Sequence, residues 1–157
     1  SIAYQFFDLL VTMTFRFAQY KDLLIVRKFL SSAGLPYEDF DTHILNFLLA
    51  EKNSRLIGVV GIELLGNVAL LRSLAVKKTE RNGSIGKKLV DHIKAYDQLN
   101  NVEKCFLLTT TAQDFFQKIG FEVISRTEAP PEIQGTEEFK NICPASALFM
   151  AQDLRRE

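Results

Sequence analysis

The sequence is short of the residues that crosslink a fold or carry it across a membrane. It has no tryptophan, two cysteines and four prolines among 157 residues. Cys105 and Cys143 lie too far apart to frame a disulfide scaffold or a zinc site, so we expect no metal, reduced thiols and a cytoplasmic location. No apolar run reaches the ~18 residues that would span a bilayer, and we expect no membrane partner.

Charge of one sign is also not in excess, with 19 Lys+Arg against 19 Asp+Glu. A net charge of zero argues against a protein whose main work is to grip phosphate backbones, so we expect no nucleic-acid partner. A local basic patch remains open. Hydrophobic residues make up 47% of the chain and charged residues 24%, which is typical of a globular domain. This length fits one domain that needs no crosslinks.

The first twelve residues are apolar but lack the positively charged start of a secretory signal. Two interpretations of 1–12 stay open. The segment is either an extension added ahead of the domain, or a native strand or arm that packs on a neighbour. We expect residues 13–157 to form a single domain.

The hydrophobic pattern switches between period two and period 3.6 along the chain. Short apolar or alternating runs predict strands at 14–18, 46–51, 55–64, 68–76, 104–109, 121–125 and 146–151. Helical spacing predicts helices at 22–32, 84–96 and 112–119, with a weaker helical stretch at 37–45. We expect Asp22 to cap the first helix and Thr110 or Thr111 to cap the third, and 129–143 to be a polar connection with a turn of helix. This order predicts an α+β domain.

A strand, a turn and a helix follow one another within 70–93. Gly83 and Gly86 open the helix, whose first backbone N–H groups have no intrahelical partner and suit a phosphate group. Arg81 and Lys87 add positive charge. The pattern is neither GxxxxGK[ST] nor GxGxxG, which argues against a nucleotide-binding P-loop and a Rossmann site. An ordinary turn is the competing interpretation.

This stretch resembles the acyl-CoA-binding motif of the GNAT N-acetyltransferases, Q/R-x-x-G-x-G/A. Arg81, Ser84 and Gly86 stand at its defined positions, so a serine replaces the middle glycine. A second stretch, 106–126, resembles the later strand–helix–strand of the same proteins, with its Asn-x-x-Ala, Tyr and Gly-Phe. The matching residues are Thr109, Ala112, Phe116, Gly120 and Phe121. Phe116 stands where many members have a tyrosine general acid, and a ring without a hydroxyl cannot take that role.

The run of threonines before Phe115 and Phe116 is similar to the acetyltransferase domain of N-acetylglutamate synthases. It looks closer still to small N-acetyltransferases encoded in arsenic-resistance operons, through 70–76, 107–116 and the tail 131–150. The resemblance implies a GNAT acyl-CoA N-acyltransferase fold, with a mixed, mostly antiparallel central sheet flanked by helices.

The resemblance also implies that acetyl-CoA is the co-substrate, and that an amine attacks its acetyl group directly in a ternary complex. The thioester and pantetheine would pair with the strand ending at Val76, and the pyrophosphate would lie on the following turn. The residues implied for acetyl-CoA are Leu74, Ala75, Val76, Arg81, Asn82, Gly83, Ser84, Ile85, Gly86, Lys87, Thr109 and Phe116.

Glu63 and Arg72 are two charged residues that we expect on the central strands. If 66–67 is a two-residue hairpin loop, Glu63 opposes Leu70 and lies diagonal to Arg72 on one face of the sheet. One interpretation is an ion pair at a sheet edge. The other makes Glu63 the catalytic base, acting through water, and Arg72 with Ser73 the site of a substrate carboxylate, which the arginine fork matches bidentately.

The expected function is acetylation of a small-molecule amine, an amino acid or a similar compound. Two alternatives stay open: a GNAT-fold module that binds acyl-CoA without turnover, favoured by Phe116 and Ser84, and a protein N-acetyltransferase, which needs an open groove. Packing or surface roles are expected for His43 and His92, and a core position for Cys105. A homodimer is left open.

Overall fold

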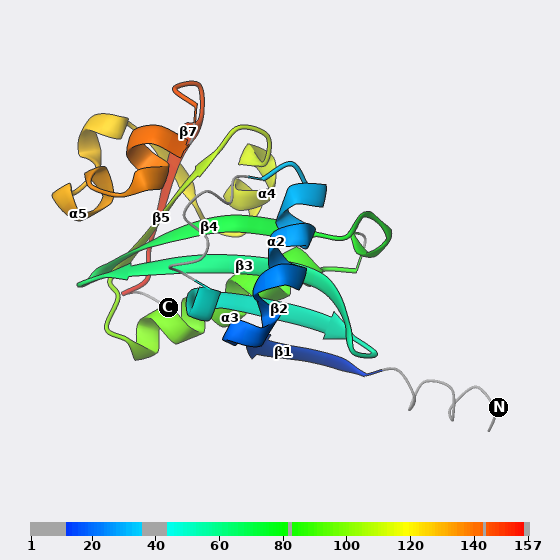
Figure 1. Cartoon of the computed structure of the whole chain (residues 1–157). Helices are drawn as coiled ribbons and strands as arrows, with labels where there is room; N and C mark the ends of the chain where they lie inside the picture. The colour runs from blue at the N-terminus through cyan, green and yellow to red at the C-terminus, as the bar shows by residue number, and fades with distance from the viewer. Residues whose placement is uncertain (1–11, 36–43, 82, 143, 156–157) are drawn as a thin grey trace.

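A single mixed sheet organises the part of the chain that the computed structural model describes, residues 12–35, 44–81, 83–142 and 144–155 (Figure 1). Within these residues seven strands lie in the order β1-β2-β3-β4-β5-β7-β6. The strands are β1 (Met13–Phe17), β2 (Phe47–Lys52), β3 (Arg55–Leu65), β4 (Val68–Val76), β5 (Lys104–Thr109), β6 (Glu122–Ile124) and β7 (Leu148–Asp153). All neighbours are antiparallel except β4 and β5, which are parallel. This confirms the predicted α+β class with a mostly antiparallel sheet.

Helices cover both faces of the sheet. They are α2 (Leu23–Ser32), α3 (Ile85–Leu99), α4 (Gln113–Lys118) and α5 (Pro131–Gln134). In Figure 1, α2 crosses the front of the sheet and α3 lies behind it. α2 buries Val26 and Leu30 against Phe47 and its neighbours, and α3 buries Leu89 and Ile93 on the opposite face. The 3.6-residue spacing of these apolar side chains is what lets each helix pack along one stripe.

Asp22 is the N-cap residue of α2, as predicted, but its side chain does not cap the helix, and the predicted Thr110 or Thr111 cap of α4 is wrong. The Asp22 carboxylate makes no cap bond to α2; it accepts hydrogen bonds from the Gln19 N–H and from Arg16 instead. α4 begins after Ala112, whose N–H donates to Thr109 Oγ1 at 3.0 Å. In each case the polar side chain satisfies a nearby loop group, as short polar residues do outside helices.

The C-terminal part is more helical than expected. Residues 129–143 hold α5 and a π-helical segment, Glu138–Ile142, rather than one turn of helix. The last strand is shifted to Leu148–Asp153, because residues 145–146 form a turn. The predictions for 1–11, for most of the 37–45 helix, and for His43, Asn82 and Cys143 lie outside the described residues.

Two bulges change which side chains share a face. On β3, Leu56 and Gly58 pair with Glu51 and Ala50, so Ile57 is the extra residue. Ile57 therefore packs with the α3 side, although strict alternation placed it on the face of Glu63. The second bulge, on β4, shapes the site described next.

Candidate active site

The sheet opens between its two parallel strands. β4 pairs with β5 only through Val68–Leu70 and Lys104–Phe106. Beyond Phe106, β5 continues with β7 on its other side, while β4 continues with β3. In the described part of the chain, the second half of β4 therefore has no strand partner on its β5 side.

A bulge at Ser73 accompanies this opening. The pairs Val59↔Ala75 and Gly61↔Arg72 leave Val60 opposite both Ser73 and Leu74. Ser73 has a φ of +57°, in the left-handed region that non-glycine residues seldom adopt. A bulge bends its strand and adds twist, which turns β4 away from β5.

The exposed edge of β4 carries backbone groups that point into the opening. The Lys77 N–H donates to the Ile57 carbonyl of β3 at 2.8 Å. Successive N–H groups alternate sides along an extended strand, so the Val76 N–H points away from β3, and the Leu74 N–H does likewise. The N–H groups on this edge are thus available to a chain that lies in the opening as an additional strand would.

A cleft of about 370 Å³ fills the space between β4 and β5. Its walls come from both strands, from the segment that follows α2, from the β5–α4 loop and from the C-terminal segment. The lining residues include Leu71, Arg72, Ser73, Leu74, Leu107, Thr109, Ala112, Phe116, Glu138 and Ala147. The sequence-based candidates Arg72, Ser73, Leu74, Thr109 and Phe116 are therefore brought together, although a long stretch of chain separates Leu74 from Thr109.

Three charged side chains form a buried cluster beside this cleft. Arg72 Nη1 donates to Glu63 Oε1 at 2.8 Å, and Arg72 Nε lies 3.9 Å from Glu138 Oε1. The side chains of Arg72, Glu63 and Glu138 are 1%, 9% and 7% exposed. The predicted register, with Glu63 opposite Leu70, is confirmed. The ion pair that was one interpretation of these residues is present, and a second carboxylate joins it.

Glu138 is the residue that sequence reasoning missed. It lies in the π-helical segment and lines the cleft, whereas Glu63 is not among the lining residues. No local pattern marked it, because it is one acidic residue in a polar connection. The available signal was its place in the tail 131–150, which carries part of the family resemblance.

The β4–α3 loop lies at the far end of β4 from the pairing with β5. Ser84 immediately precedes α3 and has a φ of +65°, with no side-chain cap bond. This serine thus adopts the left-handed conformation that a glycine would favour at the middle position of the family motif. The helix that begins here has 15 residues, so its N-terminus carries partial positive charge.

The side chains of this loop have specific neighbours. Arg81 Nε donates to the Val76 carbonyl at 3.1 Å, which closes the loop onto the end of β4. Lys87 pairs with Asp91 one turn along the helix, at 2.7 Å. A Cβ atom at Gly86 would lie 3.3 Å from Phe115 Cζ, so the absence of a side chain lets α3 and α4 approach closely.

On the opposite wall of the cleft, the β5–α4 junction is held by a side-chain hydrogen bond and by aromatic packing. Thr109 Oγ1 accepts the Ala112 N–H, and Phe116 is 4% exposed. The Phe116 ring packs edge-on against Phe115 and Phe121, with centroid distances of 5.1 and 5.6 Å. Phe116 thus packs in the core and also lines the cleft.

The family described as "Acetyltransferase (GNAT) domain" matches residues 43–123. The chain belongs to this family. Among curated relatives, an uncharacterized N-acetyltransferase of Chlorobaculum tepidum is 32% identical over 97 residues, 61% of this chain and 62% of the relative. An amino-acid acetyltransferase of Vibrio atlanticus is 25% identical over 113 residues, 71% of this chain and 25% of the relative. The matches thus cover less than two thirds of either relative.

The GNAT fold is also shared with a solved structure of N-acetylglutamate synthase from Neisseria gonorrhoeae, complexed with coenzyme A and L-arginine. Its TM-score is 0.79 at 21% identity, and the likeness covers 92% of this chain and 34% of that one. At this identity the likeness shows the fold.

No helix in the described ranges is long and apolar enough to cross a membrane. Among the same residues, no group of three or more His, Cys, Asp or Glu side chains could hold a metal ion.

Proposed function

We propose that this GNAT protein transfers the acetyl group of acetyl-CoA to the amine of a small molecule, an amino acid or a similar compound. The observation that carries the proposal is the opened β4–β5 junction, where the free edge of β4 runs toward the N-terminus of α3. An extended chain with an anionic group at one end fits this path. Because the protein belongs to the acetyltransferase family, we take acetyl-CoA to be the molecule that lies along this path.

Acetyl-CoA would be held mainly by backbone groups. In the proposal the edge of Leu74, Ala75 and Val76 pairs with the pantetheine arm, and Thr109 and Phe116 form the opposite wall. The loop Arg81–Lys87 binds the pyrophosphate through the exposed N–H groups at the start of α3, which include Ile85 and Gly86. When bound, acetyl-CoA supplies a thioester carbonyl activated for attack.

The acceptor amine has to lose a proton and meet that carbonyl from the cleft. The Leu74 or Val76 N–H is suited to stabilise the negative charge that develops on the carbonyl oxygen. Glu63 is the proposed proton acceptor, and a water carries the proton because Glu63 itself does not line the cleft. Glu138 does line it, and its carboxylate can hold the acceptor's ammonium group before transfer.

Arg72 is the proposed partner of the acceptor's carboxylate, together with Ser73. It lines the cleft, and Glu63 orients its guanidinium. The amino-acid acetyltransferase among the relatives supports this class of acceptor. A cleft bounded by Gly34 and Leu35 on one side and by Glu138 and Pro144 on the other supports a small acceptor over a protein chain.

The test is a free-thiol release assay with acetyl-CoA, amino acids, glutamate-like organoarsenicals and the amines that lack the carboxylate. Wild type is expected to acetylate at least one amino acid faster than its decarboxylated amine. Arg72→Lys keeps the charge but loses the planar fork, so the acceptor KM should rise while the KM for acetyl-CoA is unchanged.

Equal rates on an amino acid and its amine, in both wild type and variant, would show that Arg72 is structural. Binding of acetyl-CoA with no thiol release on any acceptor would instead favour a module that binds acyl-CoA without turnover.

A further inference from the structure

We propose that the protein has a second small-molecule site, for an anion with an apolar body, in a cavity between α2 and the outer ends of β3 and β4. The cavity measures about 630 Å³, larger than the β4–β5 cleft and within the usual range of small-molecule sites. It is lined by Ile25, Lys28, Phe29, Ser32, Ala33, Ser54, Arg55, Leu56, Val76, Lys77, Lys78 and Arg81. None of these residues lines the β4–β5 cleft.

The floor of this cavity is apolar. On α2, Val26 and Leu30 are buried in the core. The neighbouring Ile25 and Phe29 line the cavity. Ile25 is 53% exposed, which is high for a large aliphatic side chain beside a cavity. Leu56 continues this surface from β3 and is half-buried. Contact between these side chains and the apolar part of a ligand would stabilise the complex, because it would bury apolar surface away from water.

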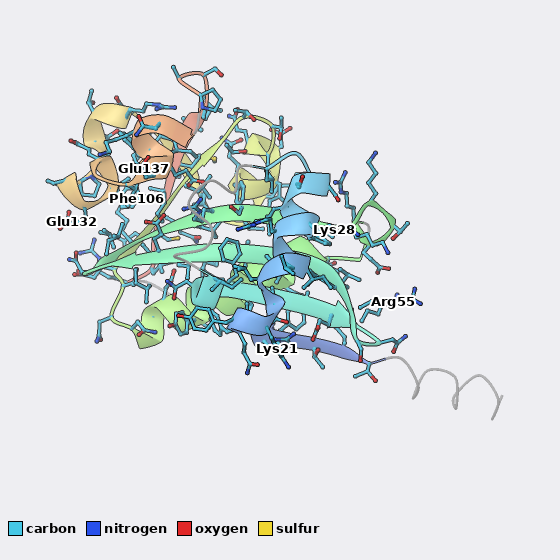
Figure 2. All side chains as sticks on the ribbon, viewed as in Figure 1. Lys21, Lys28, Arg55, Phe106, Glu132 and Glu137 are labelled. Atoms are coloured by element: carbon cyan, nitrogen blue, oxygen red, sulfur yellow. The ribbon has the colours of Figure 1, made fainter. Side chains whose placement is uncertain are left out.

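All the charged residues that line the cavity are cationic. Lys28 comes from α2, Arg55 from the start of β3, and Lys77, Lys78 and Arg81 from the segment after β4. Figure 2 labels Lys28 and Arg55, which project at the same end of the sheet. No acidic residue is among the lining residues of the cavity.

Glu80 is the acidic residue beside these five cations, where it lines an adjoining pocket with Arg55 and Lys77. The ion pairs among the described residues include none of the five. Glu80, next to Arg81 in the chain, pairs with Lys52 at 3.4 Å. Like charges gathered on a concave surface focus a positive potential, which attracts a multivalent anion. The cationic residues and the apolar floor of the cavity therefore suit a phosphorylated or polycarboxylate compound that also has an apolar group.

Phenyl phosphate is a suitable probe, because it joins an aromatic ring to a dianion. We expect it to shift the backbone amide NMR signals of Ile25, Phe29 and Leu56, and to bind more tightly than inorganic phosphate or phenol. Lys28→Glu and Arg55→Glu each reverse one exposed charge on the rim. Each should weaken phenyl phosphate binding about tenfold or more, whereas Lys118→Glu, the same change on α4, should leave it unaltered.

Two results would overturn the proposal. One is equal affinity for phenyl phosphate and inorganic phosphate, with no response to Lys28→Glu or Arg55→Glu, which would indicate general anion attraction to the surface. The other concerns acetyl-CoA, since Val76 and Arg81 also belong to its proposed site. If acetyl-CoA alone shifts Ile25 and Phe29, and phenyl phosphate no longer binds when acetyl-CoA is saturating, the cavity belongs to the co-substrate. Simultaneous binding with separate sets of shifted amides supports a second site, whatever the outcome of the turnover assay.

Discussion

At the scale of single residues, Asp97 is the side chain with the most unusual environment. It lies on α3, is 0% exposed and sits beside the buried Cys105 thiol. Burial raises the pKa of Asp97 to about 7, and the Cys105 thiol opposes this rise in part. The thiol of Cys105 is itself held protonated, because burial raises its pKa. Cys105 is thus a core residue, as expected from its place in a buried strand.

Asp97 predicts a specific dependence of stability on pH. In the unfolded chain an aspartate ionises near pH ~3.9, whereas in the folded protein Asp97 keeps its proton to about pH 7. The folded state therefore binds more protons over this interval. The contribution of Asp97 to stability is therefore greatest below pH ~4 and falls as the pH rises toward 7, by about a few kcal/mol.

Asp97→Asn removes this titration, so the loss of stability between pH 5 and pH 8 should be smaller than in wild type. Urea unfolding at both pH values measures the difference. Asp91→Asn is the control, because Asp91 lies on the same helix but is exposed. An unchanged pH dependence in Asp97→Asn would show that Asp97 is ionised in the folded protein.

Gly86 is the residue on which the acetyl-CoA proposal is most easily tested. A valine there would press on Phe115 and project at the start of α3, where the pyrophosphate is proposed to bind. Gly86→Val should lose the rise in melting temperature that wild type shows with acetyl-CoA, a rise expected by mass action.

The melting temperature without ligand must be measured beside it, because crowding of Phe115 also lowers stability. Gly135→Val makes the same change at the C-cap of α5, where a Cβ atom meets only ordinary contacts at 3.6 Å or more, and should keep the shift. An intact shift in Gly86→Val would contradict the placement of the pyrophosphate.

At the scale of elements, α4 contributes Phe116, which has no proton to donate, to a wall of the cleft. Phe116→Leu should reduce kcat less than tenfold, through looser packing, because no proton is transferred from this side chain. A loss of about 10³-fold, the scale of removing a positioned acid, would contradict this. Phe149→Leu is the matched control: Phe149 is 1% exposed and packs on Phe106 and Phe139, away from the cleft. Steady-state kinetics on both variants, with melting temperatures, separates packing from chemistry.

At the scale of the whole molecule, the two halves of the sheet are joined through the short pairing of β4 with β5. Acetyl-CoA bound in the opening should bridge them. Hydrogen exchange at the Leu74 and Val76 amides is expected to slow on binding, because these N–H groups face the opening. The Ala75 amide faces β3 and should be protected in both states. Equal slowing at all three amides, or at none, would count against pairing along this edge.

The sequence by itself determined the elements and most of their order. The loop at Gly66-Asn67 and the alternation of β3 and β4 were enough to predict that Glu63 faces Leu70 and meets Arg72. These features depend on turn chemistry and side-chain periods over a few residues, which a sequence displays directly. The family motifs, although altered at Ser84 and Phe116, identified the same fold.

Only the tertiary structure decided how the cleft between β4 and β5 forms and which residues surround it. The left-handed Ser73 and the parting of β4 from β5 depend on which strand pairs with which, and no local period encodes that. Glu138 reaches Arg72 because the C-terminal segment folds back beside β4. The cationic cavity likewise gathers α2, β3 and the end of β4. Such contacts depend on how elements distant in sequence pack together. No local sequence pattern therefore links the residues that make them.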